Sequence, residues 1–160
     1  MEHKGILIVM SGFSGAGTGT IVKEILKKYG DDYKLSISAT TRQPRKGEVD
    51  GKDYFFLTKN KFESMIEQDG FVEWAEYVGN YYGTPKEWVE DQLNKGNKIL
   101  LEIEMQGALK VRQKIKDALL LFITPPDYLT LKERLINRGT EDMETVNNRL
   151  KRAVKETEYI

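Results

Sequence analysis

The sequence of 160 residues contains no cysteine and only one histidine, His3. The lack of cysteine excludes a disulfide scaffold, a thiolate metal site and a cysteine nucleophile. Because His3 lies near a terminus, we do not expect catalysis that depends on an imidazole. No apolar run approaches the roughly twenty residues that are needed to cross a bilayer. We therefore expect a cytoplasmic protein that has no membrane partner.

The sequence also lacks an excess of either charge. Lys plus Arg and Asp plus Glu number 25 each, so the formal net charge is zero. A general nucleic-acid partner is not expected, because such proteins usually carry a basic surface. The length suits one compact domain with a small inserted lobe.

Hydrophobic patterning predicts an α/β fold. Apolar runs typical of buried strands alternate with amphipathic helical segments, which predicts a parallel sheet with right-handed crossovers. The predicted strands are Gly5–Met10, Lys98–Glu104 and Ala118–Thr124. Residues 35–82 instead show short alternating runs, which predict a separate β-rich lobe. Thr84, followed by Pro85 and Glu87, predicts a capped helix start.

A glycine-rich segment follows the first predicted strand, and residues 12–20 read Gly-Phe-Ser-Gly-Ala-Gly-Thr-Gly-Thr. This resembles the phosphate-binding pattern G-x-x-x-x-G-K-[ST], but Thr18 stands at the lysine position and Gly19 at the hydroxyl position. The alternative is a tight strand-to-helix turn without a ligand. On the first interpretation, the residues that bind the ATP phosphates are Gly12, Ser14, Gly15, Ala16, Gly17, Thr18, Gly19 and Thr20.

Two acids lie at the carboxyl end of the second predicted strand. Glu102 and Glu104 are two residues apart, so they share one face of that strand. Ligands of open α/β sheets bind outside this edge, and a carboxylate there needs a cation or a donor-rich partner. The alternative is that both acids pair with nearby Lys or Arg.

Three arginines lie near the C-terminus. Arg134 and Arg138 are four residues apart on one predicted helical face, and Arg149 follows a break that contains glycine and acids. Arginines on a closing segment commonly stabilise the charge that develops in phosphoryl transfer. Each of them alone would equally suit a solvated helix surface.

Across essentially the whole chain, the order of these segments resembles the guanylate kinase family. The family-like segments are Ser36–Arg45, Gly47–Phe55, Phe71–Trp74, Gly79–Thr84, Glu102–Gly107 and Arg138–Glu141. The resemblance implies transfer of the γ-phosphoryl group of ATP to GMP with Mg²⁺. It also implies a P-loop three-layer core at 1–34 and 84–160, an inserted GMP-binding lobe at 35–83, and a small helical lid at about 137–149.

The resemblance also implies roles for individual residues. The implied GMP-binding residues are Ser38, Arg42, Arg45, Tyr54, Glu73, Tyr82, Thr84 and Glu104. Among them, Arg42 and Arg45 resemble the clamp on the GMP phosphate, and Glu73 resembles the residue that reads guanine. The implied catalytic arginines are Arg42, Arg134, Arg138 and Arg149. Glu102 is implied to act indirectly on the metal or its waters.

Two features depart from the family pattern. The family has lysine at position 18, where this chain has Thr18, so we expect weakened use of ATP. The family also continues beyond residue 160 into a strand and a final helix, so we expect that the sequence stops short of the full protein. The alternative function is a non-catalytic guanylate-kinase-like module that binds GMP or a phosphopeptide.

Overall fold

The structure is a computed structural model that describes residues 5–77, 79–137 and 143–159. Two expectations, His3 in a terminal segment and Arg138 in the lid, fall outside the described residues. None of the described helices is long and apolar enough to span a membrane.

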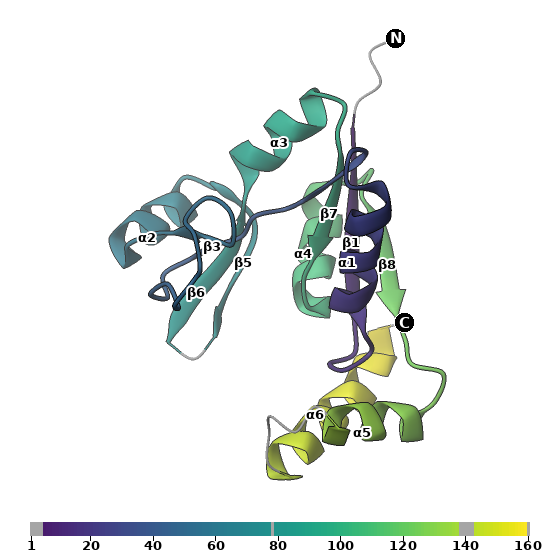
Figure 1. The fold of residues 1–160 in the computed structure, drawn as a ribbon. Coiled ribbons are helices and arrows are strands. Elements are labelled where there is room, and N and C mark those ends of the chain that lie inside the picture. Colours follow the sequence, from purple (N-terminus) through teal and green to yellow (C-terminus); the bar gives the residue numbers. More distant parts are fainter. Residues whose placement is uncertain (1–4, 78, 138–142, 160) are drawn as a thin grey trace.

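The core contains a four-stranded parallel sheet with the order β2-β7-β1-β8 (Figure 1). Its strands are β1 (Ile6–Gly12), β2 (Tyr33–Leu35), β7 (Lys98–Glu102) and β8 (Leu119–Ile123). The helices of this part are α1 (Thr18–Tyr29), α3 (Lys86–Asn94), α4 (Met105–Lys114), α5 (Tyr128–Asn137) and α6 (Met143–Glu156), and a short 3-10 turn, Thr157–Tyr159, follows α6. The alternation of parallel strands with helices confirms the predicted α/β class.

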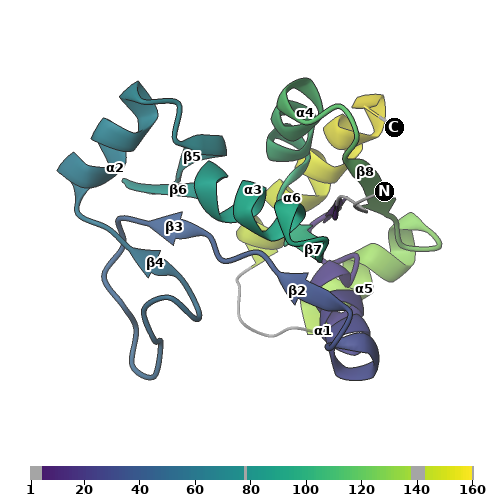
Figure 2. The ribbon, with the colours of Figure 1, turned by 90° about the horizontal axis from the view of Figure 1, so that it is seen from above.

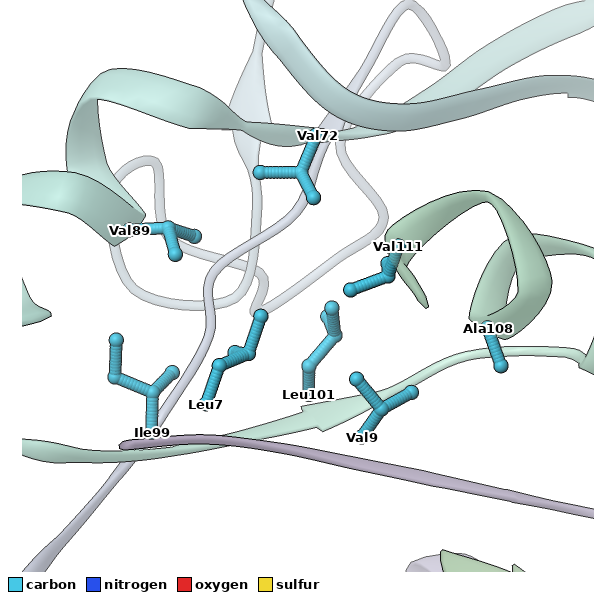
Figure 3. Close-up of a cluster of buried hydrophobic side chains, with 8 residues drawn as sticks. All are labelled: Leu7, Val9, Val72, Val89, Ile99, Leu101, Ala108 and Val111. Atoms are coloured by element: carbon cyan, nitrogen blue, oxygen red, sulfur yellow. The ribbon is translucent and has the colours of Figure 1, made fainter. Parts of the chain in front are cut away.

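Helices cover both faces of this sheet because the apolar residues of each central strand alternate between two packing clusters. Ile8 and Met10 of β1 pack with Val22 of α1. Leu7 and Val9 face the opposite way, into the cluster that Figure 3 shows. That cluster unites two strands of the core sheet with α3, α4 and β5, and its buried members are Leu7, Val9, Val72, Val89, Ile99, Leu101, Ala108 and Val111.

The second sheet is mixed and has the order β4-β3-β6-β5. Its strands are β3 (Ala39–Thr40), β4 (Phe55–Phe56), β5 (Phe71–Tyr77) and β6 (Asn80–Pro85), and α2 (Lys59–Glu67) packs against it. Figure 2 shows these elements to one side of the core, with α3 directly after β6. Val72 of β5 belongs to the core cluster, so the two sheets share buried surface.

Lysines of α4 hold the outer edge of the second sheet to the core. Strand β5 is an edge strand, so the carbonyl groups on its open side need other donors. Lys110 Nζ donates to the Trp74 carbonyl and Lys114 Nζ donates to the Phe71 carbonyl, each at 2.8 Å. Lys114 also pairs with Asp69 at 2.6 Å. These lysines fix the second sheet against α4.

The predicted helix start at Thr84 is wrong in its detail. Helix α3 begins at Lys86 with Pro85 as its N-cap residue, and no side chain caps it. Thr84 lies in β6, and its hydroxyl donates to Glu73 instead. Strand β6 extends through Thr84 to Pro85, so Pro85 rather than Thr84 precedes the first helical residue and the Thr84 hydroxyl is directed to Glu73.

An aromatic stack centred on Phe62 provides the first prediction. Phe62 is fully buried, and its ring stacks on Phe71 at 4.2 Å and on Tyr81 at 5.3 Å. Phe62→Ala is expected to lower the free energy of unfolding by about 3–5 kcal/mol in urea denaturation. Val49→Ala, at a side chain that is 54% exposed, is the control and is expected to stay within about 0.5 kcal/mol. A loss at Phe62 as small as that of the control would contradict this account of the stack.

Candidate functional site

The glycine-rich loop joins β1 to α1 at the carboxyl edge of the core sheet (Figure 1). Gly15 and Gly17 have φ angles of 93° and 99°, a region that glycine enters without a steric penalty. Helix α1 begins directly afterwards, so its unpaired N–H groups face the loop. Anions bind well at such helix starts. Beside the loop lies an open hollow of about 370 Å³ lined by Gly15, Gly17, Thr20, Arg134 and Asn137.

Thr18 contributes no charge to this hollow. A Cβ atom added at Gly12 would lie 2.9 Å from Thr18 Oγ1, so the hydroxyl lies close against the start of the loop. A lysine at this position would carry a mobile positive charge several bonds further from the backbone. The first turn of α1 therefore offers backbone N–H groups to a phosphate, but no cation.

Two arginines from the helices below the loop in Figure 1 supply positive charge instead. Arg134 of α5 donates from Nη1 to the Ala16 carbonyl at 2.9 Å. Arg149 of α6 donates from Nη1 to the Ser14 hydroxyl at 2.5 Å. The structure thus brings two of the three predicted C-terminal arginines onto the loop.

Glu102 lies on the other side of the loop, at the end of β7. A Cβ atom at Gly19 would lie 3.1 Å from Glu102 Oε1, so the missing side chain of Gly19 leaves room for this carboxylate. Burial raises the pKa of Glu102, and the positive charge of Lys23 opposes that shift.

The donor set around Glu102 limits the kind of metal site that the chain can build. Among the described residues, no group of three or more His, Cys, Asp or Glu side chains could hold a metal ion. Mg²⁺ commonly takes one or two protein carboxylates and completes its shell with water and substrate phosphates. A single carboxylate at the phosphate-binding loop fits that pattern.

The side chains predicted to clamp the acceptor phosphate come from the connection between β3 and β4 and from β6. The guanidinium of Arg42 lies 5.3 Å from the ring centroid of Tyr54, and the rings of Tyr54 and Tyr82 are 6.3 Å apart. The pKa of Arg42 is raised, first by its hydrogen bond with Glu48 and further by one with the Tyr82 hydroxyl. The backbone N–H of Arg45 donates to the same Glu48 carboxylate. Arg42, Arg45, Tyr54 and Tyr82 therefore belong to one cluster.

Glu73 lies further along the same sheet, where it is buried against the core. Its Oε1 accepts a hydrogen bond from the Thr84 hydroxyl at 2.7 Å. A Cβ atom at Gly107 of α4 would lie 3.2 Å from Glu73 Oε2, so the carboxylate needs a residue without a side chain there. Burial raises the pKa of Glu73, whereas Thr84 and Lys110 lower it and the charge of Glu104 raises it. Glu104, the N-cap residue of α4, therefore lies close enough to interact with Glu73.

Strand β6 connects the two groups of residues. Tyr82 and Thr84 are two residues apart in β6, so they share one face at a separation of about 6.5–7 Å. Ala39 pairs with Gly83 and Thr40 with Tyr82, which places Ser38 next along β3, level with Thr84. One face of the sheet thus presents a cationic, hydroxyl-rich end and a carboxylate end, at a spacing that a nucleoside monophosphate can span.

Three residues on which this geometry depends were not predicted from the sequence. Glu48 holds Arg42, Lys110 faces Glu73, and Gly107 gives the Glu73 carboxylate its space. Lys110 and Lys114 recur at helical spacing directly after the strand-end acids, a signal that could have indicated their role. The contacts of Glu48 and Gly107 join segments whose approach no local pattern reveals.

Comparison with known proteins identifies similar chains. A family model described as guanylate kinase matches residues 4–160. The crystal structure of guanylate kinase from Anaplasma phagocytophilum is similar to this chain with a TM-score of 0.64 and 29% sequence identity. The similarity covers 98% of this chain and 88% of that one.

Burial of Glu73 predicts a pH-dependent stability. Because the folded protein raises the pKa of Glu73 above its ordinary value of 4.5, the folded state binds this proton more tightly than the unfolded state does. The resulting contribution to stability is present below pH 4.5 and is lost as the pH rises through the folded-state pKa. Glu73→Gln has no carboxylate to titrate, so its stability is not lost in this way. The difference in free energy of unfolding, variant minus original chain, is therefore expected to increase as the pH rises over this range.

Urea denaturation at a series of pH values measures this difference. Glu76→Gln, at an exposed position of the same strand, controls for the loss of one carboxylate. A Glu73→Gln difference that stays constant from pH 4.5 upward would show that burial does not penalise the charged form.

Proposed function

The chain belongs to the guanylate kinase family, and on that premise we propose how its residues share the work of the reaction. Its function is that of a guanylate kinase, an ATP:GMP phosphotransferase that produces ADP and GDP. The observation that supports the proposed site most strongly is the shared face of β6, with Arg42, Tyr54 and Tyr82 at one end and Glu73 and Thr84 at the other. In this proposal residues 35–83, which contain most of the second sheet, are the GMP-binding lobe.

Arg42, Arg45, Tyr54 and Tyr82 bind the phosphate of GMP. A guanidinium group is planar and always charged, and its paired N–H groups match two phosphate oxygens. The tyrosine hydroxyls add neutral donors beside Arg42, since the Tyr54 ring contacts its guanidinium and Tyr82 is hydrogen-bonded to it. This end of the site holds the acceptor oxygen in place, which is most of what phosphoryl transfer requires of an enzyme.

Glu73 selects guanine, with Ser38, Thr84 and Glu104 beside it. Guanine presents N–H donors on the edge where adenine has an acceptor. A buried carboxylate accepts hydrogen bonds from such donors, but against an acceptor it stays unpaired, which costs free energy. The Thr84 hydroxyl donates to Glu73 Oε1, and Oε2 lies on the side of Gly107, where the proposal places the donors of the base. Donors from guanine stabilise the charged form that burial disfavours.

The glycine-rich loop binds the ATP phosphates through backbone N–H groups and the start of α1. Arg134 and Arg149 neutralise charge on the group in transfer, because both lie on the loop. Arg138 belongs to the same proposed set, and the lid at about 137–149 carries it together with Arg149. When Mg²⁺ is bound with ATP, it supplies further charge neutralisation, and Glu102 is the carboxylate placed to hold it or its waters.

Two further points remain part of the proposal. The partners are ATP and GMP, and the cytoplasmic location expected from the sequence stays a prediction. The core at 1–34 and 84–160 would then carry the ATP site, separate from the GMP-binding lobe. No observation favours the alternative of a non-catalytic binding module.

Selection of guanine by Glu73 can be tested by nucleotide binding. GMP is expected to bind at least about a hundredfold more tightly than AMP, because AMP would bury an acceptor against the carboxylate. Glu73→Gln is expected to remove most of this preference, since an amide can serve an acceptor as well as a donor. Glu76→Gln, exposed on the same strand, is the matched control. Titration calorimetry measures both ligands, and equal affinity for GMP and AMP in the original chain would refute the assignment.

The role of Thr18 can be tested by restoring the charge. Thr18→Lys is expected to raise the turnover of ATP plus GMP by roughly a hundredfold to a thousandfold, the usual value of one fixed charge that meets the transition state. GMP affinity is expected to change little, because position 18 lies in the ATP-phosphate loop. Thr18→Met adds similar length without charge and serves as the control. An unchanged rate in Thr18→Lys, or an equal gain in Thr18→Met, would show that the missing charge does not limit turnover.

A further inference from the structure

We propose that Glu48 is a positioning residue of the GMP-phosphate site: its carboxylate joins Arg42 to the backbone of Arg45 and sets the orientation of the Arg42 guanidinium. This inference rests on the proposed function, because it concerns the residues assigned to the phosphate. Glu48 is then an acidic side chain with a function in a site that binds an anion.

The contacts of Glu48 are specific to these two arginines. Arg42 Nη2 donates to Oε1 and Arg42 Nη1 to Oε2, both at 2.9 Å. The same Oε2 accepts the backbone N–H of Arg45 at 2.6 Å. One carboxylate oxygen therefore connects both arginines of the clamp, and a change in its position moves one relative to the other.

The hydrogen bonds with Glu48 and Gln43 use only part of the donor set of Arg42. A guanidinium has five N–H donors. Glu48 and the Gln43 carbonyl take both donors of Nη1 and one donor of Nη2. The Nε–H and the second N–H of Nη2 project from one edge of the planar group, and they are also the donors left for the hydrogen bond with the Tyr82 hydroxyl. Two parallel donors on one edge match two oxygens of a phosphate.

Two aromatic rings lie on one side of the same guanidinium, with their centroids 5.8 Å apart. Its central carbon lies 5.3 Å from the Tyr54 ring centroid and 5.9 Å from that of Phe56. These rings restrict tilting of the Arg42 guanidinium. They do not prevent its rotation within its own plane. The paired hydrogen bonds to Glu48 fix that remaining rotation.

The other acids of this loop serve the backbone instead. Asp50 accepts from the Phe56 N–H and Asp53 accepts from the Val49 N–H, each at 2.8 Å. Glu48 also keeps its charge over the useful pH range, because Arg42 and the Arg45 N–H lower its pKa to about 2. It therefore acts as a constant counter-charge, and Asp53 offers a matched control in the same loop.

The test compares GMP with guanosine, which lacks the phosphate, by titration calorimetry on the full chain. Glu48→Ala is expected to weaken GMP binding by about tenfold to a hundredfold, while guanosine affinity stays within about twofold. Glu48→Gln retains one acceptor oxygen and is expected to fall between Glu48→Ala and the original chain. Asp53→Asn, which keeps an acceptor for Val49, is expected to leave the ratio of the two affinities unchanged.

Three results would contradict a positioning role of Glu48 or the proposed phosphate clamp. If Glu48→Ala and Glu48→Gln leave the ratio of GMP to guanosine affinity unchanged, or lower both affinities equally, Glu48 has no positioning role. Tighter GMP binding in either variant would show that Glu48 competes with the phosphate, and would also overturn the proposal. If the original chain binds guanosine as tightly as GMP, the phosphate clamp itself fails, which is a failure of the proposed function rather than of this inference.

Discussion

The buried carboxylate of Glu73 is the constraint on which the rest of the site depends. It lies where the second sheet meets α4, and it has a hydrogen bond from Thr84 and space beside Gly107. A buried charge without partners is costly, so the carboxylate requires both its neighbours and the contact between the two sheets. That contact is supported by Val72 in the core cluster and by Lys110 on the edge of β5. The packing that stabilises the fold thus also sets the position of Glu73, the proposed guanine reader.

The two nucleotide sites differ in how completely they are built. In the proposed acceptor site, Tyr82, Thr84 and Glu73 lie on one sheet face, and Arg42 and Tyr54 lie beside Tyr82. The donor site has its glycine loop and helix start, but it takes its cations from Arg134 and Arg149 on the C-terminal helices rather than from position 18. A fixed lysine acts from inside the loop, whereas these arginines reach it from other helices. In the proposed function, capture of ATP therefore depends on the arrangement of α5 and α6.

The sequence predicted the architecture well because its signals are local. The apolar run at β1 and the glycine pattern after it each depend on a few neighbouring residues, and the structure has a strand and a helix start where they place them. The second predicted strand is shorter than expected, because β7 ends at Glu102 and Glu104 is the N-cap residue of α4. The roles of Arg42 and Glu73 came from resemblance, since no spacing rule brings residues 42, 73 and 107 together. Thr84 shows the limit most clearly. Its local context favours a helix cap, but the pairing of β6 with β5 extends the strand through Thr84, and its hydroxyl donates to Glu73 eleven residues away.

The central claim is that one GMP molecule lies along β6, with its phosphate at Tyr82 and its base at Glu73. A crystal structure of the chain with GMP tests this most directly. The account predicts guanine N–H groups within about 3 Å of the Glu73 carboxylate, and phosphate oxygens on Arg42, Arg45 and the hydroxyls of Tyr54 and Tyr82. A nucleotide bound with its base away from Glu73, or with its phosphate away from Arg42, would contradict it.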